Sequence, residues 1–203
     1  MEKAKTIFLS ILRDKNISRE KFRETANILA ELIAHEALDH IQTEKTTIET
    51  PLATAQGLKI KPHILLIPIL RSGITMLEPF LKYFQKATVG VVGLKRDEET
   101  AIASMYYNNI PSIPKDHKII ILDPMIATAG TGISTLQILK ERGIKEEDII
   151  FASIISAPEG LQSIRTKFPN ITILTAGVDE KLNKNKFIVP GLGDFGDRYF
   201  GTE

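Results

Sequence analysis

Runs of branched apolar residues recur along the chain from about residue 60 onward. Five of them, Ile64–Leu70, Ala87–Leu94, Ile119–Leu122, Ile149–Ser156 and Ile171–Val178, have the length of a β-strand. Apolar runs without polar alternation are typical of strands that are buried on both faces of a parallel sheet. Because helical patterns alternate with these runs, we expect an α/β fold with a mostly parallel sheet flanked by helices.

Helices are expected before and between the strands. Ser18 is a suitable N-cap, and residues 22–37 place apolar side chains at the spacing of one helix face. A second helix is predicted over Ser134–Arg142, and a third is predicted to start at Pro158. Residues 43–61 mix threonine and isoleucine with polar residues, which predicts a hairpin or a connecting strand.

Length and composition narrow the class of protein. With 203 residues the chain fits one domain, which we divide into a core of about residues 60–178 and a terminal segment of about residues 179–203. The 26 basic and 25 acidic residues nearly balance, which argues against a nucleic-acid partner. Cysteine is absent, and neither a signal peptide nor a membrane-spanning run is visible, so we expect a soluble cytoplasmic protein without a membrane partner.

The strand ending at Leu122 leads into the most informative loop. Asp123 and Pro124 end the apolar run, and small residues follow up to Gly132. A small-residue loop before a helix, at the carboxyl edge of a parallel sheet, is suited to a phosphate group. Asp123 would repel that phosphate and is better suited to sugar hydroxyls or to water on Mg²⁺. The alternative is an ordinary tight turn between strand and helix.

This loop fits neither of two common nucleotide-binding patterns. No lysine follows its last glycine, so it is not a P-loop, and its glycine spacing does not match the dinucleotide-binding fingerprint.

Two further strands end in cations. Arg71 follows the run that ends at Leu70 and precedes Ser72 and Gly73, and Lys95 and Arg96 follow the next run. Since the carboxyl ends of parallel strands meet at one edge of a sheet, these groups would line one crevice with enough positive charge for a diphosphate. A salt-bridging arginine at a strand tip is the alternative for Arg71.

Residues 97–117 show no clear periodicity. A segment of this length inside a compact domain suggests a flexible lid loop over the crevice. A plain hairpin with Tyr106 and Tyr107 on its two faces is the competing interpretation, and the two can coexist.

The segment from Lys186 to the end is rich in glycine and aromatic residues. Glycines allow the backbone to approach a flat ligand closely, so its N–H and C=O groups can read the ligand. A structural clasp that closes the domain is the alternative.

Four stretches resemble motifs of one family. Asp123–Thr128 is similar to its phosphoribosyl diphosphate loop, Pro68–Gly73 to its diphosphate loop, Lys95–Thr100 to a segment with a diphosphate-binding arginine, and Pro190–Thr202 to its base-binding end. The family is that of the uracil phosphoribosyltransferases, a branch of the type I phosphoribosyltransferases. The chain departs from its common pattern at Ser72, Ala129, Thr131 and Phe195.

The resemblance implies transfer of phosphoribose from 5-phospho-α-D-ribose 1-diphosphate to uracil, which yields UMP and diphosphate in pyrimidine salvage. It implies catalytic roles for Asp123, Arg71, Arg96 and Asp194. It also implies a hood formed by residues 179–203 that closes over the base, Mg²⁺ carried by substrate and water near Asp194, a homo-oligomer (dimer or tetramer) and GTP as a candidate effector.

The implied binding residues form two sets. Phosphoribosyl diphosphate would contact Arg71, Arg96, Asp123, Pro124, Met125, Ile126, Ala127, Thr128, Ala129, Gly130, Thr131 and Asp194, and uracil would contact the backbone at Ile188, Gly193, Asp194 and Phe195. A phosphoribosyltransferase for another base and a non-enzymatic sensor of UMP or phosphoribosyl diphosphate remain alternatives.

Overall fold

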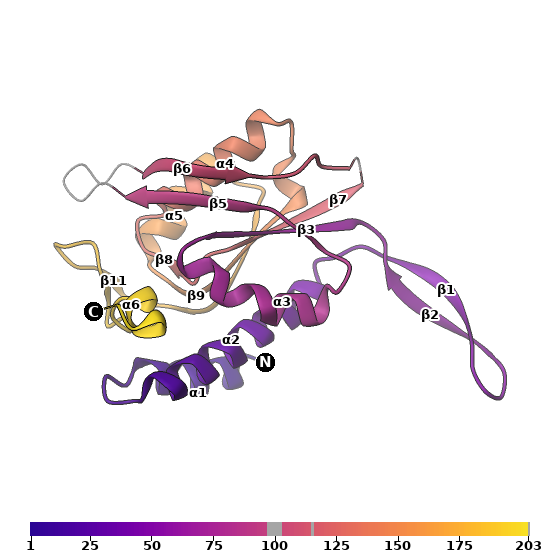
Figure 1. Ribbon diagram of the computed structural model, residues 1–203, viewed down its shortest axis with the longest axis horizontal. Helices are drawn as coiled ribbons and strands as arrows, with labels where there is room; N and C mark the ends of the chain where they lie inside the picture. The colour runs from indigo at the N-terminus through magenta and orange to yellow at the C-terminus, as the bar shows by residue number, and fades with distance from the viewer. Residues whose placement is uncertain (97–102, 115, 203) are drawn as a thin grey trace.

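A central sheet with helices on both faces forms the body of the protein (Figure 1). The computed structural model describes residues 1–96, 103–114 and 116–202. Within them the sheet has the order β10-β9-β7-β3-β5-β6, with β4 beside β3 and β8 beside β9. Its strands are β3 (His63–Leu70), β4 (Thr88–Val89), β5 (Val91–Arg96), β6 (Ala103–Asn109), β7 (His117–Leu122), β8 (Met125–Ile126), β9 (Ile149–Ser156) and β10 (Thr172–Val178). Every pairing is parallel except β5 with β6, so the predicted fold class is confirmed.

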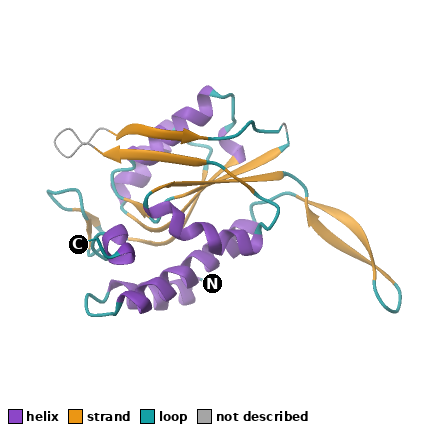
Figure 2. Cartoon of the chain, viewed as in Figure 1, coloured by secondary structure: helices purple, strands orange, loops and turns teal. Residues whose placement is uncertain are grey.

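Helices cover the sheet in two layers (Figure 2). One layer holds α1 (Glu2–Arg13), α2 (Arg19–Leu38), the 3-10 turn η1 (Ser72–Met76) and α3 (Leu77–Tyr83); the other holds α4 (Gly130–Glu141) and α5 (Pro158–Lys167). A short turn, η2 (Glu146–Asp148), precedes β9. The hood contains β11 (Lys181–Leu182), β12 (Ile188–Val189) and α6 (Phe195–Phe200).

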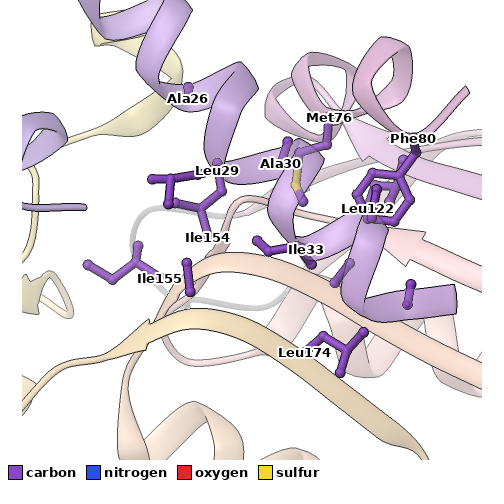
Figure 3. Packing of buried hydrophobic residues seen from close by; sticks show 14 of the residues in the cluster. Ala26, Leu29, Ala30, Ile33, Met76, Phe80, Leu122, Ile154, Ile155 and Leu174 are labelled. Atoms are coloured by element: carbon purple, nitrogen blue, oxygen red, sulfur yellow. The ribbon is translucent and has the colours of Figure 1, made fainter. Parts of the chain in front are cut away.

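Alternate residues of each central strand feed two separate cores. Leu66 and Ile120 pack in the cluster with α1, α2 and α3, while Ile67 and Ile121 pack in the cluster with α4 and α5. Both sets are fully buried, which is why these strands read as continuous apolar runs. Figure 3 shows the first cluster, in which Leu29 and Ile33 of α2 lie over the sheet.

Residues 43–60 form the expected hairpin, which extends away from the body (Figure 1). Strand β1 (Thr43–Glu49) pairs antiparallel with β2 (Thr54–Ile60). Ile48 and Leu58 are 48% and 69% exposed on it, so the hairpin presents apolar side chains to solvent.

Two sequence expectations need correction. Helix α4 begins at Gly130 rather than at Ser134, because the small-residue loop is shorter than the pattern suggested. The expected strand 87–94 is interrupted at Gly90, where a Cβ atom would lie 2.9 Å from Cδ of Pro111. The sequence analysis also missed α1, whose buried face consists of Lys5, Leu9 and Leu12.

The lysine explains why α1 was missed. Lys5 is 1% exposed, and its ammonium group pairs with Glu2 and Glu36 and reaches the carbonyl oxygen of Thr175. A charged residue at a core position breaks the apolar periodicity on which helix prediction depends.

Candidate active site

The carboxyl ends of β3, β5 and β7 lie side by side at one edge of the sheet. Register pairs Pro68 with Leu122 and Leu70 with Gly93, so Arg71 and Asp123 follow neighbouring strand ends. The turn after Arg71 packs directly on β7, because a Cβ atom at Gly73 would collide with the carbonyl oxygen of Leu122. The structure thus brings two of the predicted site residues to one place, as parallel pairing requires.

The predicted phosphate loop is compact. Met125 and Ile126 form β8 against β9, and Ala129 then adopts left-handed backbone angles (φ 65°, ψ 14°) as the N-cap of α4. Gly130 and Thr131 therefore open the helix, with backbone N–H groups that have no acceptor within it. Such an arrangement is suited to an oxyanion.

Helix α5 closes the loop from behind. A Cβ atom at Gly160 would collide with the carbonyl oxygen of Ala127 and would lie 3.0 Å from Cγ2 of Ile126. The absence of a side chain at this position allows the helix to support the loop backbone directly.

Asp123 is held by two hydrogen bonds at the mouth of this loop. The backbone N–H of Met125 donates to its Oδ1 atom (3.4 Å), and the Thr131 hydroxyl donates to its Oδ2 atom (3.2 Å). Part of the residue reaches solvent, but the surrounding protein desolvates the carboxyl group. This burial raises the pKa of Asp123 to about 7, although the two hydrogen bonds act to lower it. The group therefore changes charge near neutral pH.

Arg71 contacts the hood. Its Nη2 atom donates to Oδ1 of Asp197 (3.4 Å) and to the hydroxyl of Thr202 (3.3 Å), and its guanidinium lies 5.2 Å from the centre of the Phe200 ring. The side chain is 58% exposed. The sequence alternative, an arginine that forms a salt bridge at the strand tip, is therefore realised, and it leaves the guanidinium accessible to an anion.

The hood contains the predicted base-binding acid and glycines, and it meets this turn at Gly196, where a Cβ atom would lie 2.8 Å from the Ser72 hydroxyl oxygen. Asp194 is the N-cap of α6, and its Oδ1 atom accepts a hydrogen bond from the backbone N–H of Asp197 (3.0 Å). Gly191 and Gly193 adopt positive φ angles of 67° and 82°, which other residues rarely adopt. Ile188 is buried in β12.

Phe195 is turned into the core. Its ring is 1% exposed and lies 5.3 Å from the Phe22 ring of α2 and 5.9 Å from the Tyr199 ring. Arg23 adds a hydrogen bond to the carbonyl oxygen of Tyr199. The side chain of Phe195 therefore anchors the hood to α2, and only its backbone is left for a ligand.

A cleft of about 530 Å³ lies between the hood and the segment that connects α1 to α2. It is lined by Arg13, Lys15, Ile17, Arg19, Phe22, Pro190, Gly191, Leu192, Gly193, Asp197, Arg198 and Gly201. Gly193 alone belongs to the predicted binding set, so this cleft lies beside the predicted site rather than at its centre.

Two expectations reach beyond the described residues. The predicted lid includes residues 97–102 and 115, which lie outside the described residues. The Arg96 side chain, which is expected to bind the diphosphate, also lies outside them. The described part of residues 97–117 contains β6, antiparallel to β5, so the hairpin interpretation is confirmed for those residues, with Tyr106 and Tyr107 exposed.

Within the described residues, no group of three or more histidine, aspartate or glutamate side chains could hold a metal ion, and no helix is long and apolar enough to cross a membrane. The carboxylates of Asp194, which is exposed, and of Asp123 are oxygen donors of the kind that Mg²⁺ prefers, which fits an ion that arrives with its own phosphate and water ligands.

Sequence reasoning missed two residues that contact the site. Asp197 and Thr202 both belong to the motif Pro190–Thr202. They are more than 100 positions from Arg71 in the sequence, so only a structure shows that they contact it.

Similarity to known proteins identifies the family of this chain. The family model described as "Uracil phosphoribosyltransferase" matches residues 2–202. The chain belongs to the uracil phosphoribosyltransferase family. Curated relatives with that name include one from Salinibacter ruber, 41% identical over 96% of this chain and 91% of the relative, and one from Dictyoglomus thermophilum, 41% identical over 96% and 94%.

Solved structures share this fold. The chain superposes on the AQ2163 protein from Aquifex aeolicus with a TM-score of 0.88 at 35% identity, covering 98% of this chain and 95% of the other. A hypoxanthine phosphoribosyltransferase from Staphylococcus aureus gives a TM-score of 0.53 at 10% identity over 79% of this chain and 76% of that one, which shows the fold alone.

Proposed function

We propose that this protein is a uracil phosphoribosyltransferase, which converts uracil and 5-phospho-α-D-ribose 1-diphosphate to UMP and diphosphate. The observation that carries the proposal is the docking of a glycine-rich hood onto the Arg71 turn, next to the Asp123 loop, in a chain that matches the family from residue 2 to residue 202. A base-reading segment and an anion-binding edge are thus adjacent.

Each part of the site has a role in this reaction. The helix-opening N–H groups near Thr131 bind the 5′-phosphate, and Asp123 accepts hydrogen bonds from the ribose hydroxyls. Arg71, together with Arg96, stabilises the negative charge that develops on the departing diphosphate. Backbone groups at Ile188 and at Gly193–Phe195 hold uracil so that its nitrogen faces the sugar carbon C1.

No covalent intermediate with the protein is needed. As the bond from C1 to diphosphate loosens, C1 gains positive charge, and the uracil nitrogen forms the new bond from the opposite side. The N–H proton of uracil is released to solvent water or to the departing diphosphate. Placement and oriented charge can each lower such a barrier by several kcal/mol, on the order of 10 kcal/mol together. Mg²⁺, bound through the substrate near Asp194, would supply further charge stabilisation to the diphosphate.

The proposal extends to the setting of the reaction. We place it in cytoplasmic pyrimidine salvage and treat residues 1–203 as one domain. We propose a homo-oligomer in which the exposed hairpin, with Ile48 and Leu58, contacts a second copy, because an isolated two-stranded hairpin is marginally stable by itself. Light scattering of an Ile48→Asp, Leu58→Asp variant should give a lower mass than the wild type. GTP is included as a candidate effector, to be tested by adding it to the assay.

The test is a set of parallel assays with phosphoribosyl diphosphate, Mg²⁺ and one base each: uracil, orotate, cytosine, hypoxanthine or guanine. UMP from uracil alone is the expected result. Product from a different base would refute the role of the hood residues. Tight binding of phosphoribosyl diphosphate without any product would point instead to a sensor.

A further inference from the structure

The last turn of the hood is seated directly on the Arg71 turn. Gly196 has no room for a side chain, because a Cβ atom there would lie 2.8 Å from the Ser72 hydroxyl oxygen and 3.3 Å from Oδ1 of Asp194. The backbone of α6 therefore packs against the Ser72 side chain just after β3, and the side chains that follow Gly196 are brought to the Arg71 guanidinium.

Asp197 and Thr202 act on this guanidinium as a pair. Thr202 donates its hydroxyl to Oδ1 of Asp197 (2.5 Å), and the same two oxygen atoms accept from Nη2 of Arg71 at 3.4 and 3.3 Å. The backbone strengthens the pair, since the N–H of Thr202 also donates to the carbonyl oxygen of Asp197 (3.3 Å). The pair is thus a preformed acceptor for one nitrogen of the guanidinium.

The remainder of the guanidinium is left open. Within the described residues, its hydrogen bonds to Asp197 and Thr202 both use Nη2, and neither Nη1 nor Nε forms a hydrogen bond. Arginine binds phosphate oxygens best through two parallel N–H groups. One edge is therefore fixed by the hood while another edge can receive an anion.

An exposed ion pair such as Arg71–Asp197, with 3.4 Å between its nitrogen and oxygen atoms, stabilises a fold very little. Its effect on the site is orientation, because a flexible arginine that is already held in one direction loses less freedom when a ligand binds. We propose that Asp197, supported by Thr202, is a positioning residue that directs Arg71 toward the leaving diphosphate, so that the diphosphate site is complete only when the hood is docked. This inference rests on the proposed function.

The charge of Asp197 opposes this effect, since a carboxylate beside Arg71 weakens attraction of an anion. Two variants separate the contributions. Asp197→Asn keeps an oxygen acceptor for Arg71 and removes the charge, whereas Asp197→Ala removes both. If orientation dominates, the alanine variant is impaired and the asparagine variant recovers most of the activity.

The experiment compares kcat and KM for phosphoribosyl diphosphate in these variants and in Glu24→Ala, which breaks a similarly exposed ion pair with Lys21 away from the site. Asp197→Ala should lower kcat by about tenfold, more than it raises KM, because orientation matters most as charge develops on the leaving group. Thr202→Val should change kcat in the same direction by less, and Glu24→Ala should behave as the wild type.

The other outcomes overturn the inference. If both Asp197 variants bind phosphoribosyl diphosphate more tightly with unchanged kcat, Asp197 acts only through its charge; if both match the wild type, it has no role at Arg71. Calorimetric titration with phosphoribosyl diphosphate, together with thermal unfolding, identifies a variant that fails only because it is misfolded. A wild-type protein without activity toward any base would refute the proposed function instead.

Discussion

The Thr131 hydroxyl donates a hydrogen bond to Oδ2 of Asp123 at 3.2 Å, which joins the first turn of α4 to the end of β7. The contact ties the residue that would orient the ribose to the helix end that would hold the 5′-phosphate. It also fixes a carboxyl whose pKa burial raises to about 7, so the protonation of Asp123 is a direct experimental handle on the site.

The pH dependence of turnover should follow Asp123. Because the charged form is the better acceptor for ribose hydroxyls, kcat/KM for phosphoribosyl diphosphate should fall by up to about tenfold per pH unit below 7 and level off above about pH 8. Asp123→Asn should lower kcat/KM and flatten this profile. The 5′-phosphate of the substrate also titrates near pH 6, but it does so equally in both proteins. An unchanged profile in the variant would exclude Asp123 as the titrating group.

The stability of the fold should depend on the same proton. Between the ordinary value of 3.8 and about 7 the folded protein holds a proton that the unfolded chain has released, so raising the pH through this interval destabilises the fold. The loss attributable to Asp123 is on the order of a few kcal/mol. Denaturant unfolding at pH 5 and pH 8 should show a larger decrease for the wild type than for Asp123→Asn. Equal decreases would mean that the folded-state pKa is not raised.

Gly160→Ala should damage the phosphate loop from behind. The added methyl group collides with the carbonyl oxygen of Ala127, so the loop backbone must shift. We expect KM for phosphoribosyl diphosphate to rise about tenfold, since a misplaced anion site costs roughly 1.4 kcal/mol or more. Gln162→Ala, on the same helix but exposed, is the matched control. Normal kinetics in Gly160→Ala would show that the loop tolerates the shift.

Phe195→Ala should loosen the hood. It removes a buried ring that packs on Phe22, which typically costs about 3–5 kcal/mol of unfolding free energy. The KM for uracil should rise, and kcat should fall as well, because the loosened hood no longer holds Arg71 through Asp197 and Thr202. Phe187→Ala, at a ring that is 52% exposed in the same segment, should leave both unchanged. Phe195→Leu keeps an apolar anchor and should lie between these two.

Much of the fold could be predicted because parallel strands carry their signal locally. Strand β9 spans the same residues, Ile149–Ser156, that its apolar run indicated, and Ser18 caps α2 by accepting a hydrogen bond from the backbone N–H of Lys21 (3.2 Å). Once the sheet is known to be parallel, strand order alone also predicts that Arg71 and Asp123 lie at the same edge of the sheet.

The remaining features depend on contacts that no local pattern contains. Lys5 occupies a core position because two glutamates neutralise it, and one of them is supplied by another helix. Ala129 adopts left-handed backbone angles that glycine would normally be expected to supply. Phe195 could have faced the base or the core, and the Phe22 ring in α2 decides between them.

The contacts of α1 have a consequence for the order in which the chain can fold. Arg13 pairs with Asp179 and donates to the carbonyl oxygen of Gly191 (2.7 Å), and Arg198 donates to the carbonyl oxygen of Leu12 (2.9 Å). Helix α1 is therefore completed by residues that a ribosome adds more than 160 positions later. Loops that span most of the chain close slowly. During synthesis α1 should stay undocked until the hood emerges, and protease protection of residues near Leu9 should appear only in nascent chains that include the hood.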